Sequence, residues 1–213
     1  MQKLEVMQRI ITHRMVGIVR ADSADAALLL ADACIAGGIN VLEIAFTTPD
    51  TLEVIKELTK RHGDRALLGA GTVLDPETAR LAILAGAKFI ISPAVNIDTI
   101  RLCNRYQVSA IPGAMTATEI IAALDAGADI VKVFPSDVLG PAYVKALLAP
   151  LPQAPLMPTG GVTLANLADW FASGAVAVGI GSSLTGAAAQ GDYAAVTSVA
   201  RKFAAQMSDI RHR

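Results

Sequence analysis

Short apolar runs, separated by segments with helical spacing, recur along the whole chain. Eight of these runs are rich in Val and Ile, and nearly all end in Gly, Pro or a polar residue. Buried parallel strands have this pattern. The runs cover residues 16–20, 41–46, 66–71, 89–93, 108–113, 129–135, 154–160 and 175–181. The chain therefore reads as a parallel sheet whose faces are covered by helices.

The segments between the runs carry signals for the start and the end of helices. Ser23 and Asp75 stand at N-cap positions, with Pro76 at a first helical position. Thr116 and Glu119 have the spacing of a capping box. The glycine-containing phrases AGG, AGA and SGA, which would close helices just before a new strand, lie at 36–38, 85–87, 126–128 and 173–175.

This regular alternation predicts an α/β fold, a single (β/α)8 TIM barrel that occupies residues 1–213 as one domain. An extra N-terminal helix, over residues 2–11, would cap the bottom of the barrel. A doubly wound open sheet is the alternative fold. It is disfavoured because the first strand–helix turn lacks the GxGxxG nucleotide fingerprint.

Composition narrows the classes of partner and compartment. The formal net charge is −1, so we expect no nucleic acid and no anionic membrane as a partner. No apolar run reaches the roughly 18 residues of a membrane span, and the N-terminus lacks the features of a signal peptide. The lone thiols of Cys34 and Cys103 indicate a reducing cytoplasm. His13, His62 and His212 have no metal-ligand spacing, so we expect solvated histidines and no metal.

A lysine interrupts the apolar run DIVKVFP at 129–135. Desolvating an ammonium is expensive. Lys132 is therefore either structural, in an ion pair or at a strand end where it reaches water, or an amine held neutral and nucleophilic in a pocket. In a barrel, alternate strand residues face the lumen, which places Lys132 there with Ile130 and Phe134. Glu43, in VLEIAF, faces the lumen by the same argument. The two strands lie roughly opposite each other, so we expect a ligand between them rather than a direct contact.

Further polar and glycine residues follow the ends of other strands. Arg20 and Thr159 end strands, and Thr72 follows one, where barrel enzymes place their sites. Glycines in PTGG (158–161), before a helix expected near Thr163, and in GIGSS (179–183) follow the last two strands. Such loops let backbone N–H groups approach an anion, which favours a phosphate site.

Six motifs in register carry a family resemblance. They are VLEI, GAGTVLDP, FIISPA, PG at 112–113, VKVFP and MPTGGV. From about residue 14 to about 185 the chain resembles the class I aldolases that cleave 2-keto-3-deoxy-6-phosphogluconate (KDPG) and 4-hydroxy-2-oxoglutarate (KHG). The resemblance implies a cytoplasmic homotrimer in carbohydrate metabolism, in the Entner–Doudoroff pathway. It also implies small ketoacid and aldehyde substrates and no cofactor.

The resemblance also implies residue roles. Lys132 would form the Schiff base with the ketoacid, and Glu43 would act as general acid and base through water. The pyruvate pocket would be lined by Thr72, Pro93 and Phe134, and Thr159 would hydrogen-bond the intermediate. The phosphate would be held by Gly160, Gly161 and Ser182.

One position departs from the family pattern. Gluconate-type relatives have an arginine shortly after the strand-2 glutamate, where it grips the pyruvate carboxylate, but here the residue is Thr47. Arg20 ends the neighbouring strand, as in relatives that act on the phosphogalactonate epimer. The carboxylate clamp would then have moved to Arg20, with Thr47 beside it, and a 2-keto-3-deoxy-6-phosphogalactonate aldolase is the alternative function.

Two other classes of protein share parts of this pattern. A phosphate-binding barrel isomerase or decarboxylase would use the same glycine loops without needing an imine-forming lysine. A small-molecule-binding barrel would keep Lys132 protonated and paired.

Overall fold

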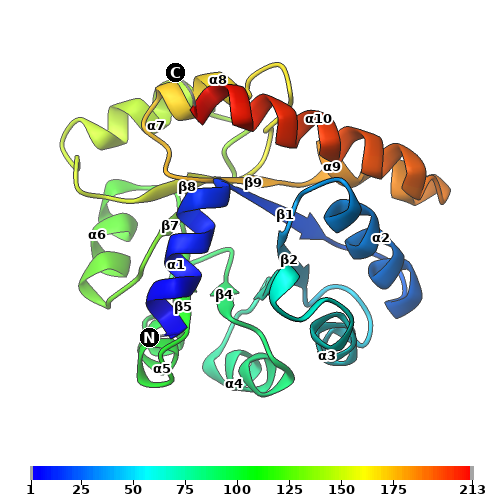
Figure 1. The fold of residues 1–213 in the computed structure, drawn as a ribbon. Coiled ribbons are helices and arrows are strands. Elements are labelled where there is room, and N and C mark those ends of the chain that lie inside the picture. The colour runs from blue at the N-terminus through cyan, green and yellow to red at the C-terminus, as the bar shows by residue number, and fades with distance from the viewer. Residues whose placement is uncertain (1, 212–213) are drawn as a thin grey trace.

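Parallel strands occupy the centre of the computed structural model, which describes residues 2–211, and helices surround them (Figure 1). Six strands form one sheet in the order β5-β4-β3-β2-β1-β9. They are β1 (Met15–Val19), β2 (Val41–Ala45), β3 (Leu67–Gly71), β4 (Phe89–Ile91), β5 (Ser109–Ile111) and β9 (Val178–Ile180). Three strands form a second sheet: β6 (Gly113–Ala114), β7 (Val131–Val133) and β8 (Leu156–Pro158). The fold is an α/β fold with a curled parallel sheet.

Pro112 divides the strand that we expected at 108–113 into β5 and β6. That prediction of one strand is wrong, because proline has no N–H to donate to a ladder. The Pro112 carbonyl still accepts a hydrogen bond from Lys132 N at 2.9 Å. At the other edge of the two sheets, a parallel bridge joins Thr159, just after β8, to Gly179 of β9.

The helices follow the strands in the alternation that the sequence predicts. Their bounds are α1 (Gln2–His13), α2 (Ala24–Ala36), α3 (Thr51–His62), α4 (Pro76–Ala85), α5 (Ile97–Arg105), α6 (Ala117–Asp125), α7 (Gly140–Leu148), α8 (Leu167–Ala172), α9 (Ser182–Thr185) and α10 (Tyr193–Arg211). Two 3-10 helices cover Gly63–Arg65 and Gly186–Gln190. Within the described residues, the helices are all too short or too polar to cross a membrane.

The predicted caps are confirmed. The side chains of Ser23 and Asp75 accept hydrogen bonds from backbone N–H groups of α2 and α4, and Thr116 and Glu119 form both bonds of the capping box. The helix expected near Thr163 instead begins at Leu167. Asn166 accounts for the delay, since its side chain accepts from Thr163 N and donates to the Gly161 carbonyl, which holds the preceding loop in a turn.

Two apolar clusters divide the strand residues by face. One cluster lies inside the curled sheet and contains Val16, Val41, Leu67, Phe89, Ile91, Ile111, Ile130, Met157 and Ala177. Val6 and Ile10 of α1 join it, so the N-terminal helix covers one end of the sheet, as expected (Figure 1). The alternate residues, such as Leu42, Val131 and Val133, pack against the helices. The predicted inward faces of the strands that carry Lys132 and Glu43 are therefore confirmed, since Ile130 and Val41 lie in the inner cluster.

Candidate active site

Lys132 and Glu43 form an ion pair inside the curled sheet. Lys132 Nζ lies 4.0 Å from Glu43 Oε1, and the two residues are 5% and 2% exposed. Our expectation that their strands lie too far apart for direct contact is wrong, because the long lysine side chain spans the interior. Lys132 Nζ also lies 4.8 Å from the centroid of the Phe134 ring, on the strand end of the same segment. The two charges that the sequence placed on the inward faces thus meet in one buried place.

The strands beside Lys132 bring Pro93 close to it. Lys132 pairs with Gly113 of β6 on one side and Met157 of β8 on the other. Gly113 touches the loop after β4, since a β-carbon on it would lie 2.3 Å from the Pro93 carbonyl oxygen. The PG motif therefore allows Pro93 to approach the strand next to Lys132.

Thr72 and Thr159 directly follow β3 and β8, at the carboxyl ends of these strands. Thr159 is 3% exposed, and its hydroxyl has no hydrogen-bond partner in the described structure. A buried hydroxyl without a partner is costly, which is typical of a group that a ligand completes. Thr72 directly follows β3, is half-buried and has a left-handed backbone with φ of 58°. For a β-branched residue this conformation is strained, and strain of this kind gathers at functional sites.

Arg20 and Thr47 lie on neighbouring strand ends, and both are exposed. A hydrogen bond joins the residues that follow them, since Ala21 N donates to the buried Thr48 hydroxyl at 3.2 Å. Within residues 2–211, the Arg20 guanidinium makes no hydrogen bond or ion pair. Thr48 escaped our sequence analysis because a threonine beside Thr47 carries no signal for a bond to a distant loop.

The two glycine loops also meet. Gly160 and Gly161 have left-handed backbones, with φ of 102° and 70°. The Ser183 hydroxyl donates to the Val162 carbonyl, which ties the loop after β8 to the start of α9. Ser182, the exposed first residue of α9, thus lies near these glycines. The helix after PTGG, α8, begins at Leu167 rather than near Thr163. Its N-terminus therefore lies further from the two glycines than expected, and its dipole contributes less to an anion site.

Asp137 lies against the same loop and was not foreseen. A β-carbon on Gly161 would come within 2.8 Å of Asp137 Cβ, and one on Gly160 within 3.3 Å of Asp137 Oδ1. Close packing against Asp137 is therefore a second reason for the two glycines. No local pattern in the sequence links residue 137 to residues 160 and 161.

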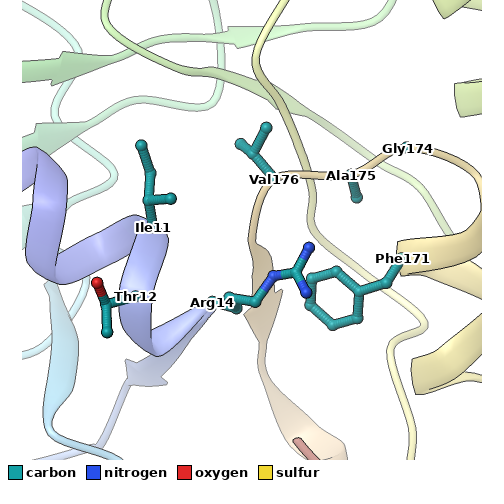
Figure 2. A pocket seen from close by; sticks show the side chains of 7 residues that line it. All are labelled: Ile11, Thr12, Arg14, Phe171, Gly174, Ala175 and Val176. Carbon is teal, nitrogen blue, oxygen red and sulfur yellow. The ribbon is translucent and has the colours of Figure 1, made fainter. Parts of the chain in front are cut away.

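The hollow in Figure 2 lies at the other end of the strands. It is lined by Ile11, Thr12, Arg14, Phe171, Gly174, Ala175 and Val176, and the Arg14 guanidinium stacks 4.4 Å above the Phe171 ring. These residues precede β1 and β9, whereas Lys132, Glu43 and the glycine loops lie within or after their strands. The hollow therefore contains none of the expected site residues.

The histidines and cysteines take no part in this arrangement. His62 is not solvated as we expected, because its Nε2 lies 2.6 Å from Asp32 Oδ1 and its side chain is 12% exposed. His13 ends α1, and His212 lies outside the described residues. Burial raises the pKa of both Cys34 and Cys103 to about 12. Within residues 2–211, no three His, Cys, Asp or Glu side chains are grouped to hold a metal ion.

A curled parallel sheet that holds a buried lysine beside a carboxylate, with loops after the strands that lie beside them, is typical of an enzyme of the α/β class. The family model for KDPG and KHG aldolase matches residues 6–199, and the chain belongs to this family of aldolases, which are lyases. The chain is 39% identical to the 2-dehydro-3-deoxy-6-phosphogalactonate aldolase of Escherichia coli, over 80% of this chain and 83% of the relative.

Solved structures agree with this assignment. A structure described as native KDPGal superposes with a TM-score of 0.87 at 34% identity, over 93% of this chain and 96% of that one. The KDPG aldolase of Legionella pneumophila, with pyruvate captured as a covalent carbinolamine, superposes with a TM-score of 0.84 at 28% identity, over 94% and 97%.

Proposed function

We propose that this protein is a class I aldolase in which Lys132 forms the Schiff base. The observation that carries the proposal is the buried pair of Lys132 and Glu43, 4.0 Å apart, inside the sheet. A lysine needs a nearby base to lose its proton before it can attack a ketone. Glu43 is the carboxylate in that position, and both side chains are buried.

The reaction would follow from these two groups. The neutral Lys132 amine adds to the C2 carbonyl, and loss of water gives a protonated imine. Glu43 takes the proton of the C4 hydroxyl, through water, while the C3–C4 bond breaks and its electron pair moves to the imine as an enamine. The aldehyde leaves. Glu43 then returns a proton to C3, and hydrolysis of the imine releases pyruvate and restores the amine.

The other inward groups would bind the pyruvate half of the substrate. Pro93 and Phe134 would flank the imine, since Pro93 reaches the strand beside Lys132 and the Phe134 ring lies 4.8 Å from Nζ. The unpaired hydroxyl of Thr159 would hydrogen-bond the intermediate. Thr72, held at the end of β3 in a strained conformation, would contribute the opposite wall.

We propose KDPG and KHG as substrates, which would release glyceraldehyde 3-phosphate or glyoxylate beside pyruvate. Gly160, Gly161 and Ser182 would hold the phosphate, because the two loops meet at the strand ends and offer backbone N–H groups and a hydroxyl. The family name and the carbinolamine captured in the Legionella pneumophila relative support this assignment.

A specific observation favours the phosphogalactonate epimer as a second candidate substrate. The guanidinium of Arg20 is exposed and unpaired within the described residues, and it lies on the strand end next to Thr47. Arg20 would then grip the substrate carboxylate, which Thr47 can meet only with a hydroxyl. The Escherichia coli relative named for that epimer supports this alternative.

The same proposal extends to the closure of the sheet, the number of domains, the assembly and the cellular setting. The two sheets would form one closed (β/α)8 barrel, since Pro112 alone separates β5 from β6 and a bridge joins Thr159 to Gly179. Residues 1–213 would be one domain. Exposed apolar side chains on and beside α4, namely Leu74, Leu81, Leu84 and Ile97, would be covered in a homotrimer. The free thiols of Cys34 and Cys103 favour the cytoplasm, with the Entner–Doudoroff pathway as the setting.

A cleavage assay with three ketoacids tests the function. The enzyme is given the gluconate epimer, the galactonate epimer or 4-hydroxy-2-oxoglutarate, and pyruvate release is measured. Release from the gluconate epimer or from 4-hydroxy-2-oxoglutarate supports the first assignment. Faster release from the galactonate epimer supports the second, and no pyruvate from any of the three contradicts the proposal.

A further inference from the structure

The carboxyl group of Glu43 occupies the space where a side chain on Gly71 would lie. A β-carbon built on Gly71 would come within 1.9 Å of Glu43 Oε1, 2.2 Å of Cγ and 2.3 Å of Cδ. These distances are far shorter than any non-bonded contact between heavy atoms. An alanine at position 71 and the observed position of Glu43 are therefore incompatible.

The strand register explains how the two residues meet. Glu43 of β2 pairs with Gly69 of β3, and Gly71 pairs with Ala45, two residues further along. Side chains in strands lean along the strand direction, so the Glu43 carboxyl extends across β3 toward Gly71. Gly71 is not among the residues with positive φ. The backbone at this position accepts any residue, and the neighbour alone excludes a side chain.

Shape, rather than hydrogen bonding, holds the Glu43 carboxylate in place. Within the described residues, its recorded polar neighbour is Lys132, and the distance of 4.0 Å is too long for a hydrogen bond. A carboxylate that is 2% exposed and not anchored by donors keeps its position only if the surrounding walls allow no other. The missing side chain of Gly71 leaves the space that the carboxylate occupies.

Gly179 leaves space for Thr159 in the same way that Gly71 leaves space for Glu43. A β-carbon on Gly179 of β9 would lie 2.3 Å from the unpaired Thr159 hydroxyl oxygen. By contrast, the nearest atoms to a β-carbon on Gly69 would belong to the Phe89 ring, and those nearest to one on Gly17 would belong to the apolar side chains of Leu42, Ile39 and Leu184. The strands thus contain glycines that border proposed site residues and glycines that border apolar side chains. The neighbour of each glycine shows whether it leaves space for the site or for the core.

We propose that Gly71 is a positioning residue for proton transfer: its missing side chain sets the Glu43 carboxylate beside Lys132. This inference rests on the proposed function. Because Glu43 is flexible, an alanine at position 71 displaces the carboxylate rather than the backbone. A displaced Glu43 slows the loss of the Lys132 proton, but at saturating pyruvate the Schiff base still accumulates, because water can also take that proton. Proton transfer at C3 needs a correctly placed carboxylate and is lost.

The first test compares two readouts in Gly71→Ala. The amount of pyruvate fixed on Lys132 by borohydride at saturating pyruvate should stay close to wild type. Exchange of the pyruvate methyl protons in deuterated water should fall by about 10²-fold, the lower range of general acid–base catalysis. Gly17→Ala is the matched control, because its β-carbon would meet apolar atoms 2.9–3.2 Å away on the helix side of the sheet. It should leave exchange near the wild-type rate. Wild-type exchange in Gly71→Ala, or an equal loss in Gly17→Ala, would overturn the inference.

The second test does not depend on activity. Gly71→Ala should lower the urea midpoint of the wild-type protein but not that of the Glu43→Ala variant, which removes all three crowded atoms. Two residues in contact show such coupling, and independent residues give additive losses. Equal losses in both backgrounds would refute the positioning role. Failure of the wild-type enzyme to bind pyruvate at Lys132 would instead refute the proposed function, and the unfolding cycle separates the two failures.

Discussion

Lys132 of β7 and Glu43 of β2, which are distant in sequence, face each other inside the curled sheet, with 4.0 Å between Nζ and Oε1. A buried ion pair of this kind contributes little net stability, because desolvation offsets the attraction. The pair is therefore better explained by chemistry than by folding, and the predictions below separate the two explanations.

Replacing Lys132 should stop the reaction without unfolding the protein. Lys132→Ala removes the amine that becomes the electron sink. Lys132→Arg keeps a positive charge beside Glu43, but a guanidinium stays protonated and cannot add to a ketone. Pyruvate release should be undetectable in both variants, and circular dichroism should show a folded protein. Measurable cleavage by Lys132→Arg would argue against an imine.

Glu43→Gln should separate imine formation from proton transfer. The amide keeps the size of the side chain but cannot accept the proton, so exchange of the pyruvate methyl protons should drop by about 10²-fold or more. The pyruvate adduct on Lys132 should persist in part, and its amount is the internal control. An unchanged exchange rate would assign proton transfer to another group.

Arg20→Ala should weaken the hold on the substrate carboxylate. Losing one hydrogen bond to a charged group costs about 1.5–3 kcal/mol, which raises the pyruvate KM roughly 10- to 150-fold. Arg20→Lys should recover part of the loss, because an ammonium lacks the planar fork of a guanidinium. Arg101→Ala is the control, since that exposed arginine pairs with Asp98 on α5. A wild-type pyruvate KM in Arg20→Ala would show that Thr47 and backbone amides, rather than Arg20, bind the carboxylate.

Ser182→Asp tests the phosphate site. Its carboxylate would face the phosphate dianion, so the KM for phosphorylated substrate should rise at least about tenfold, and the effect should shrink in high salt. The KM for 4-hydroxy-2-oxoglutarate should change less. Position 182 is exposed, whereas a side chain on Gly161 would collide with Asp137 and disturb the fold for an unrelated reason. Equal losses on both substrates would show that the loops bind no phosphate.

The cysteine thiols should be inert in the folded protein. Burial raises the pKa of Cys34 and Cys103 to about 12, so almost no thiolate is present at pH 8. A disulfide reagent such as DTNB should label them slowly in buffer and rapidly in urea. Rapid labelling of the native protein would contradict the burial of these two side chains.

Alternation along the strands was enough to predict which side chains face inward. It placed Glu43 and Lys132 on the same inner surface, because successive side chains of a strand point to opposite faces whatever the rest of the chain does. It could not give the distance between them, which depends on the curvature of the sheet and on the length of the lysine. Pro112 is visible in the sequence, but whether a proline interrupts a strand depends on the neighbours that the sheet gives it.

The relations that sequence reasoning missed join residues far apart in the chain. Asn166 delays α8 through bonds to both Thr163 and Gly161, and Thr48 links the first two strand ends. The glycines at 71 and 179 leave space for side chains on neighbouring strands. None of these contacts has a fixed spacing or a residue type that marks it, so only the folded arrangement reveals them.

The most direct test of the account is to find where pyruvate binds covalently. The protein is incubated with pyruvate and sodium borohydride, digested, and its peptides are analysed by mass spectrometry. The account predicts a single reduced pyruvate adduct on Lys132, in the peptide that contains VKVFP, and no adduct in Lys132→Ala. An adduct on another lysine, or none at all, would contradict the claim that Lys132 is the Schiff-base lysine.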